Sequence, residues 1–421
     1  MAEVWVSLLV GGTLLLIGYG ASLIFDKFRI PDFIVLIFLG VLLARIPVDP
    51  FGPGLVPSLT PILPVFTALT IAFIMFEGGL SLNLKGSGRG MPGVLAHVAV
   101  SVFITVVLIW LIATRLLGFD GVTALVLAGA FCGPSAAVIL SFAMRLKLGK
   151  AAERAVVLDA VLTNVIAVIL VFFAIRSASA EPATFLPQYA LEIALATIVA
   201  VAAGMPWRMA IKRSPSRKFM YIATVAWALV IYGIADGLIN GNGAVAAFVF
   251  GLVLAYRKPE DAPDPEGKGS LQEFQSEITF GMRTFFFIYL GLVVTVDSVT
   301  PVALMGALLL TLVFVVSRVP SSIALGRLSG YSKRETRVLI ASMARGMTDV
   351  VLVLIAIESG VVPASSVSLL VGLVTVTILV AVAVCAGLVV WAEKSPEEGQ
   401  EREIPPVQPD ADVPLRFDPP A

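Results

Sequence analysis

The chain alternates long apolar runs with short polar or charged stretches. A run of about 20 apolar residues is long enough to cross the hydrocarbon core of a bilayer as a helix. Glycine, proline and charged clusters divide the apolar sequence into successive candidate spans, of which the second and the ninth are short. The pattern predicts an all-α polytopic membrane protein with thirteen spans, at about residues 4–25, 32–45, 60–77, 93–114, 121–144, 153–175, 188–207, 218–235, 242–256, 272–296, 300–325, 336–358 and 363–392.

Composition supports a membrane protein. Hydrophobic residues make up 58 % of the chain, charged residues 14 %, and the mean hydropathy is +0.98. A soluble domain does not need that much apolar sequence to bury a core. The first run has no basic leader and is long enough to span, so we expect a retained helix and not a cleaved signal peptide. The net charge is zero, which predicts no nucleic-acid partner.

The basic residues predict the orientation. With thirteen spans, 23 of the 29 lysines and arginines fall on one side of the membrane, and only Arg45, Arg115 and Arg176 fall on the other. Basic residues gather in cytoplasmic loops. We therefore expect a plasma or inner membrane protein with its N-terminus outside and its C-terminus in the cytoplasm.

Polar residues inside the sixth span mark a candidate site. Asp159, Thr163 and Asn164 interrupt an otherwise apolar run. A carboxylate at membrane depth costs at least about 2.5 kcal/mol, so an intramembrane Asp indicates function by default. Arg318 on the eleventh span has a similar expected depth and predicts an ion pair with Asp159. Nearer the middle of the membrane we expect Asn164, Arg283, Arg345 and Asp349.

Two spans carry breaks at comparable places. The fifth contains Gly133-Pro134-Ser135 and the twelfth contains Arg345-Gly346, and proline frees backbone carbonyls in a helix. These are the fifth spans of two six-span halves, and an odd linker span inverts the second half, as in transporters built from inverted repeats. We expect a transmembrane domain over 1–394, with repeat one at 4–175, a linker helix at 188–207 and repeat two at 218–392. The proline-rich acidic segment 395–421 reads as a disordered cytoplasmic tail.

Several fragments, in order, resemble the monovalent cation/proton antiporter superfamily, in its Na+/H+ exchanger branch. They are Phe76-Glu77-Gly78-Gly79-Leu80-Ser81-Leu82, the stretches 243–252 and 283–292, and Arg318 followed by Arg345-Gly346. The resemblance implies the Na+/H+ antiporter fold, a homodimer with a dimerisation half and a core half, and exchange of Na+ or K+ for H+ by alternating access. It implies no cofactor and no enzyme activity.

The sixth helix departs from the family pattern. The family reads Glu-Ser-Leu-x-Asn-Asp or, in some branches, Glu-Ser-x-Leu-Thr-Asp, and its final Asp exchanges the ion and the proton. In this chain Asp159 takes the Glu position, Thr163 the penultimate position, and Asn164 replaces the final Asp. The fifth helix, often Thr-Asp-Pro, reads Ser135-Ala136-Ala137. A neutral amide cannot alternate between a proton and a cation.

Two carboxylates are candidates for the exchanging group. Asp159 is the first, and its competing interpretation is a permanent ion pair with Arg318. Asp349 is the second: it either forms a local pair with Arg345 at i+4 or supplies the charge that Asn164 lacks. The expected ion-binding or proton-exchanging residues are Asp159, Thr163, Asn164, Ser135 and Asp349, and the expected charge-compensating residues are Arg318, Arg345 and Arg283.

Other polar residues suggest less. Glu77 is expected to be a solvated cap or funnel residue, His97 a core or interfacial residue, and Cys132 and Cys385 packing residues; no cluster predicts a resident metal. Two alternatives to exchange stay open. One is a transport-silent or regulatory homologue, favoured by Asn164, and the other is a carrier of another solute on the same fold. The chain lacks Gly-x-Ser-x-Gly and His-Glu-x-x-His motifs, which disfavours an intramembrane enzyme.

Overall fold

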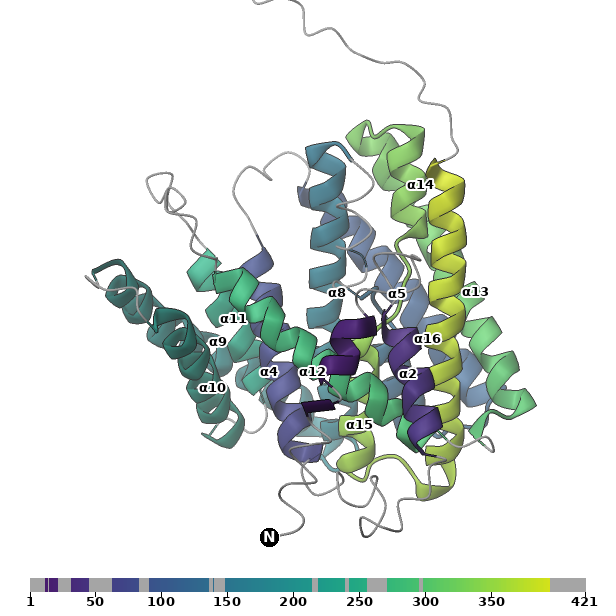
Figure 1. The fold of residues 1–421 in the computed structure, drawn as a ribbon, viewed down its shortest axis with the longest axis horizontal. Helices are drawn as coiled ribbons and strands as arrows, with labels where there is room; N and C mark the ends of the chain where they lie inside the picture. Colours follow the sequence, from purple (N-terminus) through teal and green to yellow (C-terminus); the bar gives the residue numbers. More distant parts are fainter. Residues whose placement is uncertain are drawn as a thin grey trace, which may run out of the picture.

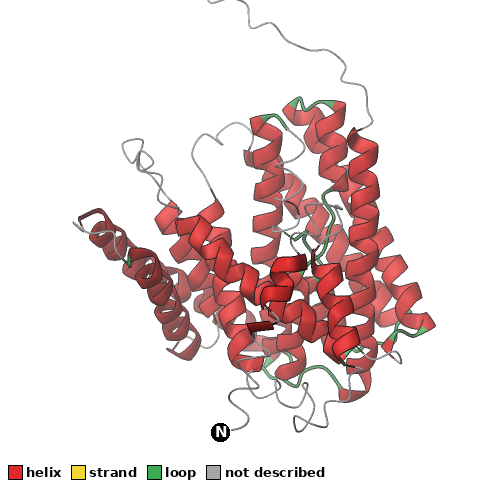
Figure 2. Ribbon diagram, viewed as in Figure 1, coloured by secondary structure: helices red, strands yellow, loops and turns green. Residues whose placement is uncertain are grey.

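The structure is a computed structural model that describes most of the apolar chain. The described residues are 12–13, 15–21, 32–44, 63–82, 91–135, 139, 148–213, 219–238, 242–255, 271–294 and 298–393. The expected tail, 395–421, lies outside these residues. Within them the regular structure is helical throughout (Figure 2).

The helices follow the apolar runs. A helical stretch covers 15–21. The bounded helices are α2 (Asp32–Leu43), α4 (Leu63–Ser81), α5 (Met91–Arg115), α6 (Gly121–Ala130), α8 (Lys150–Ser177), α9 (Pro182–Arg213), α10 (Met220–Leu238), α11 (Gly243–Ala255), α12 (Leu271–Val293), α13 (Pro301–Ser329), α14 (Lys333–Ala341), α15 (Met347–Glu358) and α16 (Ala364–Glu393).

Where the structure describes them, these elements confirm the expected spans; most of the first span, 4–25, and residues 136–138 and 140–144 of the fifth lie outside the described residues. Among the described residues, eight helices are long and apolar enough to cross a membrane, and three apolar helices are shorter. The second and ninth spans are short, as predicted, and correspond to α2 and α11. The fifth span ends its first helix, α6, at Ala130, and the twelfth is divided into α14 and α15.

Local signals explain several helix ends. Asp120 caps α6 by accepting hydrogen bonds from the backbone of Val122 and Thr123, each at 3.1 Å. Burial opposes the charged form of this carboxylate, but the hydrogen bonds prevail and hold the pKa of Asp120 below its usual value. Gly330 ends α13 in the left-handed region, at a φ of 69°. These ends separate neighbouring helices without long loops.

Packing gives the two halves corresponding neighbours. α4 packs on α11, α2 packs on α12, and α5 packs on α13. In Figure 1, α9 and α10 lie at one side of the bundle, and α13 and α16 lie toward the other. α8 packs on α6 and α5 near the middle of the molecule.

Two glycine pairs reveal the internal repeat. Gly40 of α2 meets Gly291 of α12, and Gly79 of α4 meets Gly251 of α11, each so closely that a Cβ atom has no room. Gly40 and Gly251 are each the ninth residue of their helix. Exchanging the two halves turns one pair into the other, as a two-repeat architecture requires. The sequence shows no residue-by-residue repeat. The glycines are recognised as equivalent only when the helices that they contact are known.

Candidate functional site

The broken fifth and twelfth spans meet inside the bundle. Residues 131–135 follow α6 and residues 342–346 separate α14 from α15, so each contains backbone outside a regular helix (Figure 2). The Ser135 amide donates to the Ala344 carbonyl at 2.8 Å. The Arg345 guanidinium donates to the Gly133 carbonyl. Irregular backbone at membrane depth needs such partners, because lipid supplies none.

Aromatic rings fix the Arg345 guanidinium over this crossing. Its central carbon lies 3.6 Å from the ring centroid of Phe314 and 5.9 Å from that of Phe131. Phe314 and Phe131 stack on each other with centroids 6.0 Å apart. Only 2 % of Arg345 is exposed. A buried cation is thus held by a carbonyl and an aromatic face instead of a carboxylate.

The sixth span, α8, closes against the first break. Gly133 faces the Thr163 side chain and leaves no room for a Cβ atom. The Thr163 hydroxyl donates to the Asp159 carbonyl at 2.7 Å, and the Cys132 thiol donates to the Thr163 carbonyl at 3.7 Å. The Thr163 hydroxyl oxygen keeps lone pairs that can accept or bind a cation.

The ion pair predicted between Asp159 and Arg318 is present. Arg318 of α13 donates to Asp159 Oδ2, and its Nε donates to the Leu339 carbonyl at 3.4 Å. Asp159 is fully buried and Arg318 is nearly so. His97 of α5 lies on the other side of the carboxylate, with Nε2 3.6 Å from Asp159 Oδ1. Asp159 therefore has a positively charged neighbour on one oxygen and an imidazole on the other.

Asp349 has a different set of partners. Its Oδ2 accepts a hydrogen bond from the Gly346 amide at 2.9 Å, at the first turn of α15. Within the described part of the chain no ion pair joins it to Arg345, so the local pair considered from the i+4 spacing is not formed. Asp349 is 2 % exposed. Among the described residues, Asp349 has no cation at ion-pair distance, as Asp159 has in Arg318, although the Arg345 charge is near enough to interact with it.

The remaining predicted oxygen donors lie around the same crossing. Ser135 and Asn164 are both buried. Neither side chain makes a hydrogen bond within the described residues. α15 packs on both α6 and α8, which brings the elements carrying Ser135, Asn164 and Asp349 together. The charges of Arg345, Asp349, Arg318 and Asp159 lie close enough to interact.

Arg283 and Glu77 belong to a separate polar contact. Glu77 of α4 accepts hydrogen bonds from Thr279 at 2.7 Å and from Ser276 at 3.2 Å, both on α12. Arg283 lies near Glu77 and 5.5 Å from the centroid of the Phe280 ring. Glu77 thus links α4 to α12 while it stays partly exposed, and its role as a cap or funnel residue remains a prediction.

Two neighbours of the site were not predicted. His97 packs in the core, as expected, but its place beside Asp159 was not predicted, and Phe314 carries no polar signal in the sequence. The one signal for His97 in the sequence was the position of the chain's single histidine within the apolar span that precedes the first break. Nothing in the sequence indicates that the Phe314 ring lies under Arg345.

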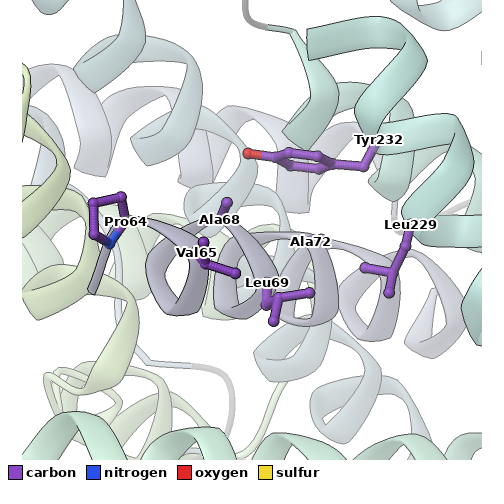
Figure 3. A pocket seen from close by; sticks show the side chains of 7 residues that line it. All are labelled: Pro64, Val65, Ala68, Leu69, Ala72, Leu229 and Tyr232. Atoms are coloured by element: carbon purple, nitrogen blue, oxygen red, sulfur yellow. The ribbon is translucent and has the colours of Figure 1, made fainter. Parts of the chain in front are cut away.

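A separate apolar groove lies between α4 and α10 (Figure 3). It has a volume of 360 Å³ and apolar walls, apart from the Tyr232 hydroxyl. Its lining offers no carboxylate, so it is not the candidate site. The lining residues are Pro64, Val65, Ala68, Leu69, Ala72, Leu229 and Tyr232.

Comparisons with known proteins identify the family and the fold. Residues 12–391 match the sequence model of a family described as "Sodium/hydrogen exchanger, transmembrane". The fold is similar to that of the sodium proton antiporter MjNhaP1 from Methanocaldococcus jannaschii at pH 8, with a TM-score of 0.76 and 16 % identity over 93 % of this chain and 99 % of that chain. An electron microscopy structure of the same antiporter matches with a TM-score of 0.72 and 16 % identity, over 93 % of this chain and 96 % of that chain. The predicted antiporter fold is confirmed.

Proposed function

The chain belongs to the sodium/hydrogen exchanger family of membrane transporters, and on this basis we propose that it exchanges a monovalent cation, Na+ or K+, for protons by alternating access. We further propose that Asp349 is the exchanging carboxylate. The observation that carries the proposal is the difference in partners between the two buried acids. Asp159 is held by Arg318, whereas Asp349 accepts only a backbone hydrogen bond among the described residues.

An exchanging group must hold either a proton or a cation. Protonating Asp159 would leave the Arg318 guanidinium buried without its partner, and breaking a buried pair in this way costs about 3–5 kcal/mol. Asp349 can take up a proton without stranding a bonded cation. Asp349 on α15 thus supplies the charge that Asn164 on α8 does not carry.

Oxygen atoms around the crossing complete a cation shell. Alkali cations take hard oxygen ligands, and helix breaks in transporters expose carbonyls for this purpose. The donors proposed here are the Ser135 hydroxyl, the Thr163 hydroxyl and the Asn164 amide oxygen, with carbonyls of residues 131–135. Asp159 stays paired with Arg318 and does not touch the cation.

One exchanging carboxylate predicts one-for-one, electroneutral exchange. We propose a homodimer in the plasma or inner membrane, with the N-terminus outside and the C-terminus in the cytoplasm. The support is the family resemblance for the dimer and the one-sided distribution of lysine and arginine for the orientation.

The test is cation-driven proton flux in sealed proteoliposomes with an internal pH dye. When Na+ or K+ is added outside, the unmodified protein is expected to take up the cation, release luminal protons and so alkalinise the lumen. Asp349→Asn is expected to reduce the rate at least about 100-fold, as loss of an essential group does. Asp236→Asn, which alters an exposed acid on α10, is the matched control and should transport normally. Full flux in Asp349→Asn would refute the assignment.

Asn164 supports one competing function, a transport-silent member of the family that serves as a sensor or partner subunit. The same liposomes separate the two proposals. A silent unmodified protein that gains flux only in Asn164→Asp would favour the silent homologue and reject exchange by Asp349.

A further inference from the structure

His97 is a buried titratable residue that cation exchange at Asp349 does not use. It lies in the second turn of α5, is 3 % exposed, and is the only histidine in the chain. Histidine is the side chain that normally changes charge between about pH 5 and 8. A buried histidine beside a charged pair therefore needs an explanation beyond packing.

Two unsatisfied atoms face each other at this point. His97 Nε2 and Asp159 Oδ1 are 3.6 Å apart, just beyond a normal hydrogen bond, and neither has a hydrogen-bond partner among the described residues. His97 Nδ1 also lacks one within that part of the chain. Buried polar atoms without partners are uncommon and cost free energy. A shift of a few tenths of an ångström would let the imidazole donate to the carboxylate.

The charged groups around His97 are few. Of the described helices packed on α5, α8 presents Asp159 and α13 presents Arg318, while α6 carries no titratable side chain. The other charged residues of α8 and α13 lie toward the helix ends. Arg176 is partly buried, and the rest are exposed: Lys150, Glu153, Arg154 and Arg327. Asp159 and Arg318 are therefore the charges that respond to a proton on His97.

We propose that His97 is a proton-dependent positioning residue for exchange, acting through Asp159. While His97 is neutral, Asp159 is bonded to Arg318 and makes no hydrogen bond to the imidazole, as in the structure. When His97 takes up a proton, both ring nitrogens become donors and Nε2–H donates to Asp159 Oδ1. The carboxylate is then shared between two cations, and the site gains one positive charge. This inference rests on the proposed function, because the added charge acts on the cation held at Asp349.

The added charge opposes cation binding. Asp159, Arg318, Arg345 and Asp349 already interact electrostatically across the crossing, so a proton on His97 reaches the cation site without direct contact. Linkage makes the effect reciprocal: if the proton weakens cation binding, the cation must expel the proton. A purely structural histidine would show no such response.

Nuclear magnetic resonance of the unmodified protein tests this directly. Because the chain has one histidine, ring-15N-labelled histidine gives a single site when the protein is purified without a histidine tag. At a pH where imidazolium and neutral signals are both present, we expect NaCl or KCl to convert imidazolium to neutral imidazole, while choline chloride at equal ionic strength does not. Identical spectra in all three salts would overturn the proposal.

Transport kinetics give an independent readout. If one proton competes with the cation, each unit by which the pH falls raises the KM for the cation by at most about tenfold. We expect the unmodified protein to exceed this limit between pH 6 and 8, and His97→Gln to fall within it. Equal pH slopes in the two proteins would overturn the inference. His97→Gln that fails to fold leaves the labelling experiment decisive.

The two proposals fail in distinguishable ways. If the unmodified protein shows cation-driven flux but its histidine signal ignores the cation, the role of His97 is rejected and exchange stands. If flux is absent at every pH, exchange itself is rejected, and with it the role of His97.

Discussion

The roles of two buried aspartates depend on the atoms that surround each carboxylate. Asp159 and Asp349 have the same side chain and comparable burial. Arg318 bonds one oxygen of Asp159, while Asp349 bonds only the Gly346 amide among the described residues. The sequence identified both acids, Arg318 and the ion pair. The pair was predictable because depth can be counted along a helix. The contacts of Arg345 with the Gly133 carbonyl and the Phe314 ring were not, because no local pattern gives the direction of a side chain.

The Asp159–Arg318 pair should be strongly coupled in stability. Arg318→Met leaves a buried carboxylate without its partner and is expected to lower the free energy of unfolding by about 3–5 kcal/mol. Asp159→Asn combined with Arg318→Met removes both charges and should recover most of that loss. Thermal unfolding of the four proteins in one detergent measures the coupling. Additive losses would mean that the pair contributes nothing as a pair.

At the scale of elements, helix breaks were predictable and their contacts were not. Interrupted helices are predicted at Gly133-Pro134 and Arg345-Gly346, because proline has no backbone N–H to donate and glycine favours irregular backbone. The hydrogen bond from Ser135 to Ala344 joins residues more than 200 positions apart. No local pattern encodes such a contact, so the crossing had to come from the structure.

Close helix pairs at glycine predict a sharp sensitivity to one methyl group. Gly251→Ala places a Cβ atom against the Phe76 carbonyl and Gly79 of α4, and both are backbone. Because backbone cannot rotate away, we expect a loss of about 1–3 kcal/mol in stability. Gly233→Ala is the matched control, since a Cβ atom there meets nothing within 4 Å. Unfolding midpoints in detergent that fall equally in both variants would contradict the close-packing account.

At the scale of the whole molecule, span order carried most of the prediction. Thirteen apolar runs, two of them broken at corresponding places, predict the repeat plan, whereas the antiporter fold was predicted from the resemblance of several fragments to the exchanger family. The pairing of Gly40 with Gly291 and of Gly79 with Gly251 adds the physical symmetry. In transporters of this architecture the broken helices of the two repeats meet at a site near the middle of the membrane. Residues 131–135 and 342–346 of this chain meet in the same way.

We propose that this chain carries its exchanging carboxylate on α15 instead of α8. The most direct measurement is cation-driven proton flux in proteoliposomes for Asp349→Ser and for Asp349→Ser combined with Asn164→Asp. We expect the single variant to be silent and the double variant to regain flux, because a carboxylate returns to the crossing from the α8 side. Undiminished flux in Asp349→Ser alone would contradict it.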